Sequence, residues 1–109
     1  MHLDVTAEVL ASQLKLGKTP TVLAQTEKAI ENTSNFHKFA KHIISLNDKL
    51  KSFDSFVALS NSVPYLKVKC EDEKFVSDFT ETLQNWSNKY HVELEKVDNK
   101  NVYYIKGIK

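Results

Sequence analysis

The most reactive side chain of the sequence is its one cysteine, Cys70, which stands between Lys69 and the acidic run Glu71–Glu73. A thiol attacks as its anion, and neighbouring carboxylates disfavour that anion. Cys70 also falls on the apolar side of an alternating segment, as buried structural cysteines do. We therefore expect Cys70 to be a core residue and name no catalytic residue. A single cysteine excludes an internal disulfide and favours a reducing, cytoplasmic location.

The four histidines do not have the spacing of a metal site. His37 and His42 are five residues apart, so on a helix they point about 140° away from each other. The other two, His2 and His91, are distant in sequence, and the chain contains no HxxxH or HExxH motif. A zinc site would have to assemble from distant segments with Cys70 as its one sulfur ligand. We predict that the protein binds no metal and no cofactor.

The carboxylates and serines also lack the arrangement of an active site. The acidic run Glu71–Glu73 matches the start of a helix, where negative charge is favourable. Glu93 and Glu95 alternate with apolar residues, as on the solvent face of a strand. No serine stands in a GxSxG motif, and two isolated glycines, Gly17 and Gly107, exclude phosphate-binding glycine loops. The sequence predicts that the protein is not an enzyme.

The first half of the chain is expected to be helical. The spacing of apolar residues predicts helices over about 6–16, 20–32 and 35–53, the second starting with the Thr19-Pro20 pair.

The chain has 109 residues, 41% of them hydrophobic and 27% charged, which is typical of a single folded domain over 1–109. No apolar run approaches the length of about 20 residues that spans a membrane, so no membrane partner is expected.

The third helix has the most regular pattern in the sequence. Its apolar residues follow one another at alternating spacings of three and four, which defines a seam along one side. We call this set the helix seam: Phe36, Phe39, Ile43, Leu46, Leu50 and Phe53. The seam has two interpretations. It covers the domain's own core, or it forms the interface of a homodimer.

The second half of the chain predicts a β-α-β-β unit. Strands are expected near 65–70, 91–97 and 102–108, with a helix over about 75–90 and a four-residue turn at 98–101. The predicted fold is therefore α+β, with N-terminal helices followed by a small mixed sheet of about three strands. The first two strands would be parallel if they were neighbours. The expected core comprises Phe36, Phe39, Ile43, Leu46, Leu50, Leu66, Val68, Phe79, Leu83, Trp86, Val92, Leu94 and Ile105.

All 15 basic residues are lysines, and the formal net charge is +1. The lack of arginine removes the planar donor that proteins use most for phosphates and guanine edges. Lysine nevertheless concentrates on one helix and in the terminal hairpin, where tyrosines accompany it. These candidate nucleic-acid contacts are Lys38, Lys41, Lys49, Lys51, Lys100, Tyr104 and Lys106.

Two functional hypotheses follow from these patterns. The first is a non-enzymatic protein-interaction or adaptor module, in its most specific form a homodimer through the Phe36–Phe53 helix seam. The alternative is a small nucleic-acid-binding protein that uses the lysine-rich helix face and the C-terminal hairpin, because lysines neutralise phosphates and tyrosines stack on bases. Sedimentation tests the first hypothesis, and salt-dependent binding to DNA or RNA tests the second.

Overall fold

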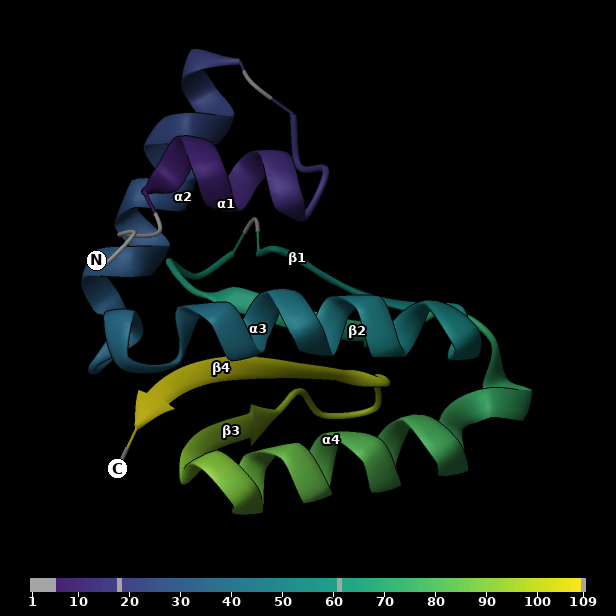
Figure 1. Cartoon of the computed structure of the whole chain (residues 1–109). Coiled ribbons are helices and arrows are strands. Elements are labelled where there is room, and N and C mark those ends of the chain that lie inside the picture. Colours follow the sequence, from purple (N-terminus) through teal and green to yellow (C-terminus); the bar gives the residue numbers. More distant parts are fainter. Residues whose placement is uncertain (1–5, 18, 61, 109) are drawn as a thin grey trace.

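Figure 1 shows a computed structural model of the chain, which describes residues 6–17, 19–60 and 62–108. Helices occupy the first half, and a four-stranded sheet with one further helix forms the second. The predicted α+β class is confirmed. The elements, in chain order, are α1 (Ala7–Gln13), α2 (Pro20–Asn32), α3 (Phe36–Leu50), η1 (Lys51–Phe53), β1 (Ser55–Leu59), β2 (Leu66–Cys70), η2 (Glu73–Phe75), α4 (Val76–Tyr90), β3 (Val92–Lys96) and β4 (Val102–Ile108).

Threonine caps start the first two helices. The side chains of Thr6 and Thr19 accept hydrogen bonds from the backbone N–H groups of Val9 and Val22, each at 3.2 Å. Such caps satisfy amide groups that have no partner inside the helix. The second helix has the predicted bounds, whereas α1 ends at Gln13, earlier than the predicted residue 16. In Figure 1, α1 and α2 lie together beside β1.

The third helix ends earlier than its apolar spacing predicts. It stops at Leu50, a short 3-10 turn follows, and Asp54 adopts a left-handed conformation with φ of 51°. This residue reverses the chain and starts β1, a strand that is absent from the predicted elements. The prediction failed here because Val57 continues the three-and-four spacing of the helix seam, so the helical pattern hides the strand.

The sheet has four strands in the order β1-β2-β4-β3, and every neighbouring pair is antiparallel. The sheet therefore has one strand more than the predicted number of about three, and the predicted mixed pairing is wrong because all pairs are antiparallel. Strands β2 and β3 are not neighbours, because β4 lies between them. The turn at 98–101 makes β3 and β4 an antiparallel hairpin, as predicted, and β4 then pairs with β2 through its other edge.

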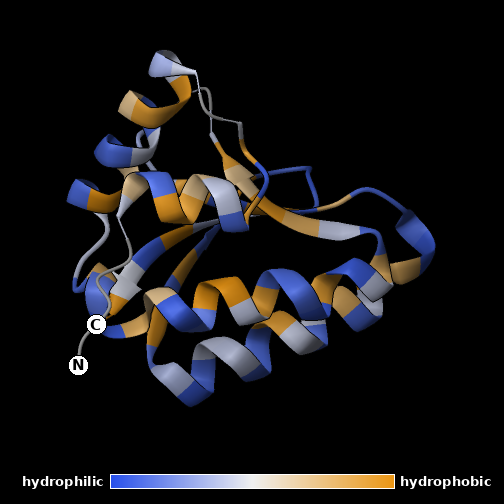
Figure 2. Ribbon diagram, turned by 45° about the horizontal axis from the view of Figure 1, so that its top comes forward, coloured by the Kyte–Doolittle hydropathy of each residue, from blue (hydrophilic) through white to orange (hydrophobic). Residues whose placement is uncertain are grey.

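Helices α3 and α4 cover one face of the sheet. Their apolar residues pack against Val57, Leu66, Val68 and Ile105, all of which are at most 1% exposed. Figure 2 shows the two helices side by side, each with apolar and hydrophilic residues in alternation. The predicted core residues are buried, except that Leu94 is partly exposed.

The end of β4 is held by the segment between α2 and α3. Ser34 donates its backbone N–H to the carbonyl of Lys106 at 3.2 Å and accepts from the N–H of Ile108 at 3.0 Å. Gly107 lies between these two contacts with a φ of 123°.

In the part of the chain that the structure describes, no helix is long and apolar enough to cross a membrane.

Candidate functional site

The face of the sheet opposite α3 and α4 carries tyrosines and lysines. Directly paired residues of antiparallel strands share a face, and the register joins Lys67 to Tyr104 and Tyr104 to Glu95 in one row. We call this surface the open face. Apart from Val102, which is 8% exposed, its residues are half-buried or exposed. The strand residues of the open face are Phe56, Ala58, Lys67, Lys69, Glu95, Val102, Tyr104 and Lys106.

Tyr104 lies in the middle of the open face. Its hydroxyl lies 3.4 Å from the hydroxyl of Ser62 in the loop between β1 and β2. Hydrogen bonding from Ser62 and Ser60, with a smaller effect of the positive charges of Lys67 and Lys100, lowers the pKa of Tyr104. The polar end of this side chain therefore lies in a positively charged environment. Its neighbour Tyr103 points to the opposite face, where its ring lies 6.1 Å from that of Phe79.

A second tyrosine lies where β2 begins. The ammonium group of Lys106 lies 4.0 Å from the centre of the Tyr65 ring, within the range of a cation–π contact. The same ammonium group lies 3.6 Å from a carboxylate oxygen of Glu95. The interaction with Tyr65, and to a smaller extent the one with Glu95, raises the pKa of Lys106. These contacts hold the Tyr65 ring in place at the margin of the open face.

The open face is hollowed between the β1–β2 loop and the β3–β4 turn. This hollow, which we call the lysine hollow, has a volume of about 300 Å³. Its polar lining comes from the β1–β2 loop, β2, the β3–β4 turn and β4, and two valines supply the apolar part. The lining residues are Ser60, Ser62, Lys67, Val97, Lys100, Val102 and Tyr104.

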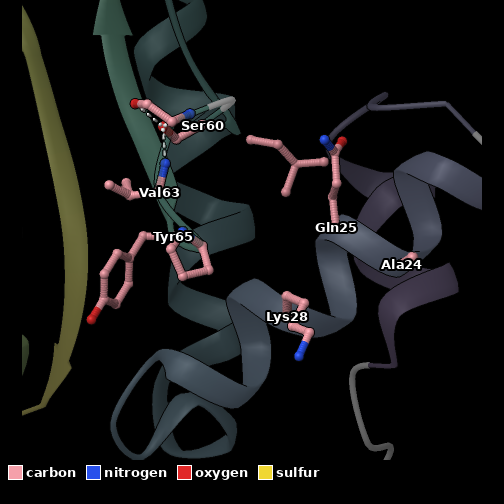
Figure 3. A pocket seen from close by; sticks show the side chains of 9 residues that line it. Ala24, Gln25, Lys28, Ser60, Val63 and Tyr65 are labelled. Carbon is pink, nitrogen blue, oxygen red and sulfur yellow. Dashed lines mark hydrogen bonds between the residues drawn. The ribbon is translucent and has the colours of Figure 1, made fainter.

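A second hollow lies on the other side of the β1–β2 loop, against α2 (Figure 3). It has a volume of about 350 Å³ and shares Ser60 and Ser62 with the lysine hollow. The hydroxyl of Ser60 accepts hydrogen bonds from the backbone N–H groups of Ser62 and Val63, which fixes the loop between the two hollows. In Figure 3, Lys28 lies on α2, opposite the loop. The loop therefore forms a common wall.

No protein-family model, curated protein or solved structure matches this chain. The chemistry of the open face therefore has to be argued from its own residues. An unpaired base stacks on an aromatic ring, and lysines attract phosphates. Both kinds of group lie together on this face: Tyr65 comes from the end of the β1–β2 loop, Lys67 from β2, and Tyr104 and Lys106 from β4.

The structure divides the predicted nucleic-acid contacts into two groups. Lys100, Tyr104 and Lys106 lie on or beside the open face. The four helix lysines are exposed on α3 and η1, which cover the opposite face of the sheet, so they point to the other side of the molecule. One of them, Lys51, forms an exposed ion pair with Asp48 at 3.2 Å. The four are Lys38, Lys41, Lys49 and Lys51.

The helix seam packs inside the domain. Five of its six residues are at most 2% exposed, and the sixth, Phe53, is partly buried against the same core. Phe39 lies against Trp86 of α4, with 6.2 Å between the ring centres. The structure thus uses the seam as the cover of the domain's own core, which is one of the two interpretations that the sequence allowed.

The reactive residues of the sequence lie away from the open face. Cys70 is buried as expected, with its sulfur 3.3 Å from the carbonyl oxygen of Asp72. His42 stacks on Tyr90 between α3 and α4, with 3.8 Å between the ring centres. His2 lies outside the described residues. Among the residues that are described, no three histidine, cysteine or acidic side chains come close enough to hold a metal ion.

Sequence reasoning missed several residues of the open face. The alternation of Tyr65, Lys67 and Lys69 indicated that these three side chains share a face, which is confirmed. Nothing in the sequence joined them to Tyr104, because the pairing of β2 with β4 was not predicted. Ser62 lies in a loop between strands and was not among the predicted site residues. The signal that could have indicated this site is the pair of serines, Ser60 and Ser62, just before a strand with Tyr65, Lys67 and Lys69 at alternate positions.

Proposed function

We propose that the protein is a non-enzymatic binding module that holds single-stranded nucleic acid on the open face of its sheet. The observation that supports this most strongly is the row in which Lys67 and Tyr104 lie side by side on neighbouring strands. A tyrosine ring stacks on an unpaired base of any sequence, and an adjacent ammonium group reaches the backbone phosphate. An exposed ring on a sheet face suits a single strand, since a double helix offers its bases only through its grooves.

The charges of the open face favour a weak and salt-dependent interaction. Lys69 and Lys106 each lie 3.6 Å from a carboxylate oxygen, of Glu71 and Glu95 respectively, so part of their charge is compensated. Lysines act as point charges and do not select a base as an arginine fork does. The proposed binding is therefore tolerant of sequence and limited to a few phosphate contacts.

Other surfaces offer less to a protein partner. The seam side chains lie in the core, so a homodimer through the seam would require α3 to leave its position. The outer strand β3 exposes Glu93, Glu95 and Lys96, and charged edge strands disfavour pairing with another chain. The adaptor role nevertheless stays a prediction, which sedimentation tests. A buried, free cysteine is compatible with the cytoplasmic location that we propose.

The test is fluorescence anisotropy of a labelled uridine-rich RNA strand, the same strand as DNA, and the corresponding duplex. We expect micromolar binding of the single strands at low salt, with little binding of the duplex. The logarithm of the affinity should fall with the logarithm of the salt concentration by about 0.7 for each phosphate contact. If neither single strand binds at low salt, the proposal is wrong.

Matched tyrosine variants locate the binding surface. Tyr104→Leu should weaken binding at least about fivefold, because stacking on one ring contributes about 1–3 kcal/mol. Tyr104→Phe keeps the ring and should lose less affinity than Tyr104→Leu does. Tyr90→Leu, on the helix side of the molecule, should have no effect on affinity, and neither should the pair Lys38→Gln and Lys41→Gln. An equal loss in these controls would place binding on the helices and contradict the proposal.

A further inference from the structure

The lysine hollow brings two lysines together. Lys67 and Lys100 line it from β2 and from the β3–β4 turn. Among the described residues, no carboxylate lies within ion-pair distance of either ammonium group, whereas Lys69 is paired with an acid. The lining residues include no aspartate or glutamate. An anion in the hollow would therefore meet two ammonium groups that form no ion pair with the acids of residues 6–17, 19–60 and 62–108.

Hydroxyl groups complete the polar lining. Those of Ser62 and Tyr104 lie 3.4 Å apart, and that of Ser60 lies 3.3 Å from Ser62. A hydroxyl rotates to donate where an acceptor is present, so this group of three offers donors from one side of the hollow. The ammonium groups of Lys67 and Lys100 offer donors from β2 and the turn. Donors from different directions suit a tetrahedral anion better than a planar one.

We infer that the lysine hollow binds the phosphate group of a nucleotide. The choice of a nucleotide as the ligand rests on the proposed function. A phosphate accepts hydrogen bonds through several oxygens, and lysine is a common point-charge donor to it. The volume of about 300 Å³ is at the lower end of the range of small-molecule sites. The two valines of the lining, Val97 and Val102, give the attached sugar an apolar contact.

This phosphate has two possible sources. An internal phosphodiester places the hollow under the middle of a bound strand, next to the base that stacks on Tyr104. A terminal phosphate makes the hollow a binding site for strand ends or for free mononucleotides. Both sources present the same oxygens to Lys67 and Lys100, so the experiment has one arm for each.

The first arm uses amide proton–nitrogen NMR correlation spectra of the full chain. Uridine monophosphate and inorganic phosphate should shift the amide signals of Ser62, Lys67 and Lys100, whereas uridine should not shift them. The double variant Lys67→Gln and Lys100→Gln should weaken uridine monophosphate about tenfold or more. The double variant Lys38→Gln and Lys41→Gln removes the same charge from the opposite side and should bind as the wild type does.

The second arm compares RNA strands with and without a terminal phosphate. If the hollow takes an internal phosphodiester, the Lys67 and Lys100 variant weakens both strands and lowers their salt dependence by about 0.7 for each lost contact. If it takes a terminal phosphate, the variant weakens only the phosphorylated strand. Either result supports the hollow as a phosphate site.

The two proposals fail in different ways. If phosphate and uridine monophosphate leave the three amide signals unchanged while RNA still binds in a manner that depends on Tyr104, the phosphate site is wrong and the proposed function stands. If phosphate binds but neither RNA nor DNA strands bind, the proposed function is wrong and the hollow is a site for a small phosphate ester. If the helix-lysine variant loses phosphate binding to the same extent, the site is not the hollow.

Discussion

The side-chain oxygen of Asn47 on α3 accepts a hydrogen bond from the backbone N–H of Val57 on β1 at 2.9 Å. Val57 pairs with Val68 through its other edge, so this N–H points away from the sheet. Asn47 is 5% exposed and Val57 is 1% exposed, so neither group has water as an alternative partner. The contact joins α3 to the edge of the sheet and closes that edge where another chain would otherwise pair with it.

Asn47→Ala should destabilise the protein by about 1–3 kcal/mol, because it leaves the buried N–H of Val57 without an acceptor. Urea denaturation followed by circular dichroism measures this loss. Ser45→Ala, at an exposed position of the same helix, is the matched control and should change the stability by less than about 0.5 kcal/mol. Equal effects of the two variants would show that the hydrogen bond contributes nothing beyond helix propensity.

Gly107→Ala should destabilise the protein by more than about 3 kcal/mol. A methyl group at this position would overlap the backbone of Ser34, and the φ of 123° is itself unfavourable for alanine. Gly17→Ala isolates the second effect, because φ there is 105° and, among the described residues beyond its chain neighbours, no atom lies within 4 Å of the added carbon. We expect Gly17→Ala to cost about 1–2 kcal/mol. Similar losses for both variants in thermal unfolding would contradict the close packing of Ser34 on β4.

Ile43→Asp should unfold the monomer. Ile43 is fully buried in the core, and an unpaired carboxylate there costs more than about 4 kcal/mol. Circular dichroism and sedimentation velocity of the wild type and the variant test this, with Ser45→Asp as the exposed control. We expect the wild type to sediment as a monomer at micromolar concentration. A dimeric wild type with a folded, monomeric Ile43→Asp variant would instead support a homodimer through the helix seam.

The helices and the later strands could be predicted because their signals are local. The Thr19-Pro20 pair starts α2 at the predicted residue, and the alternation from Leu66 to Cys70 marks β2. Strand β1 could not be found in this way, because Val57 also fits the helical spacing of the preceding residues. The reversal at Asp54 depends on a left-handed conformation that an aspartate adopts only in a suitable tertiary context.

The candidate site was predicted only in part because it depends on strand order. Each strand of the open face alternates as expected, but the position of β4 between β2 and β3 is a long-range property. Only this order brings Lys67 next to Tyr104 and separates the hairpin lysines from those of α3. The sequence therefore identified lysine and tyrosine as the relevant residue types, and the fold decides which of them lie together.

The stack of His42 on Tyr90 should make the stability depend on pH. Burial, with a smaller effect of the positive charge of Lys89, lowers the pKa of His42 below its usual value of 6.5. The unfolded chain therefore binds this proton more readily than the folded chain does, and protonation favours unfolding. The stabilising contribution is fully present above about pH 6.5 and is lost as the pH falls through the lower pKa of the folded state.

Urea unfolding of the wild type and of His42→Gln across this pH range measures the contribution. The stability difference between the two proteins should shrink as the pH falls from about 7.5 to about 5, where many carboxylates remain ionised. His37→Gln removes an exposed histidine of the same helix and serves as the control for a general effect of charge. A difference between wild type and His42→Gln that grows as the pH falls would mean that the imidazolium, rather than the neutral ring, is the form that the folded state prefers.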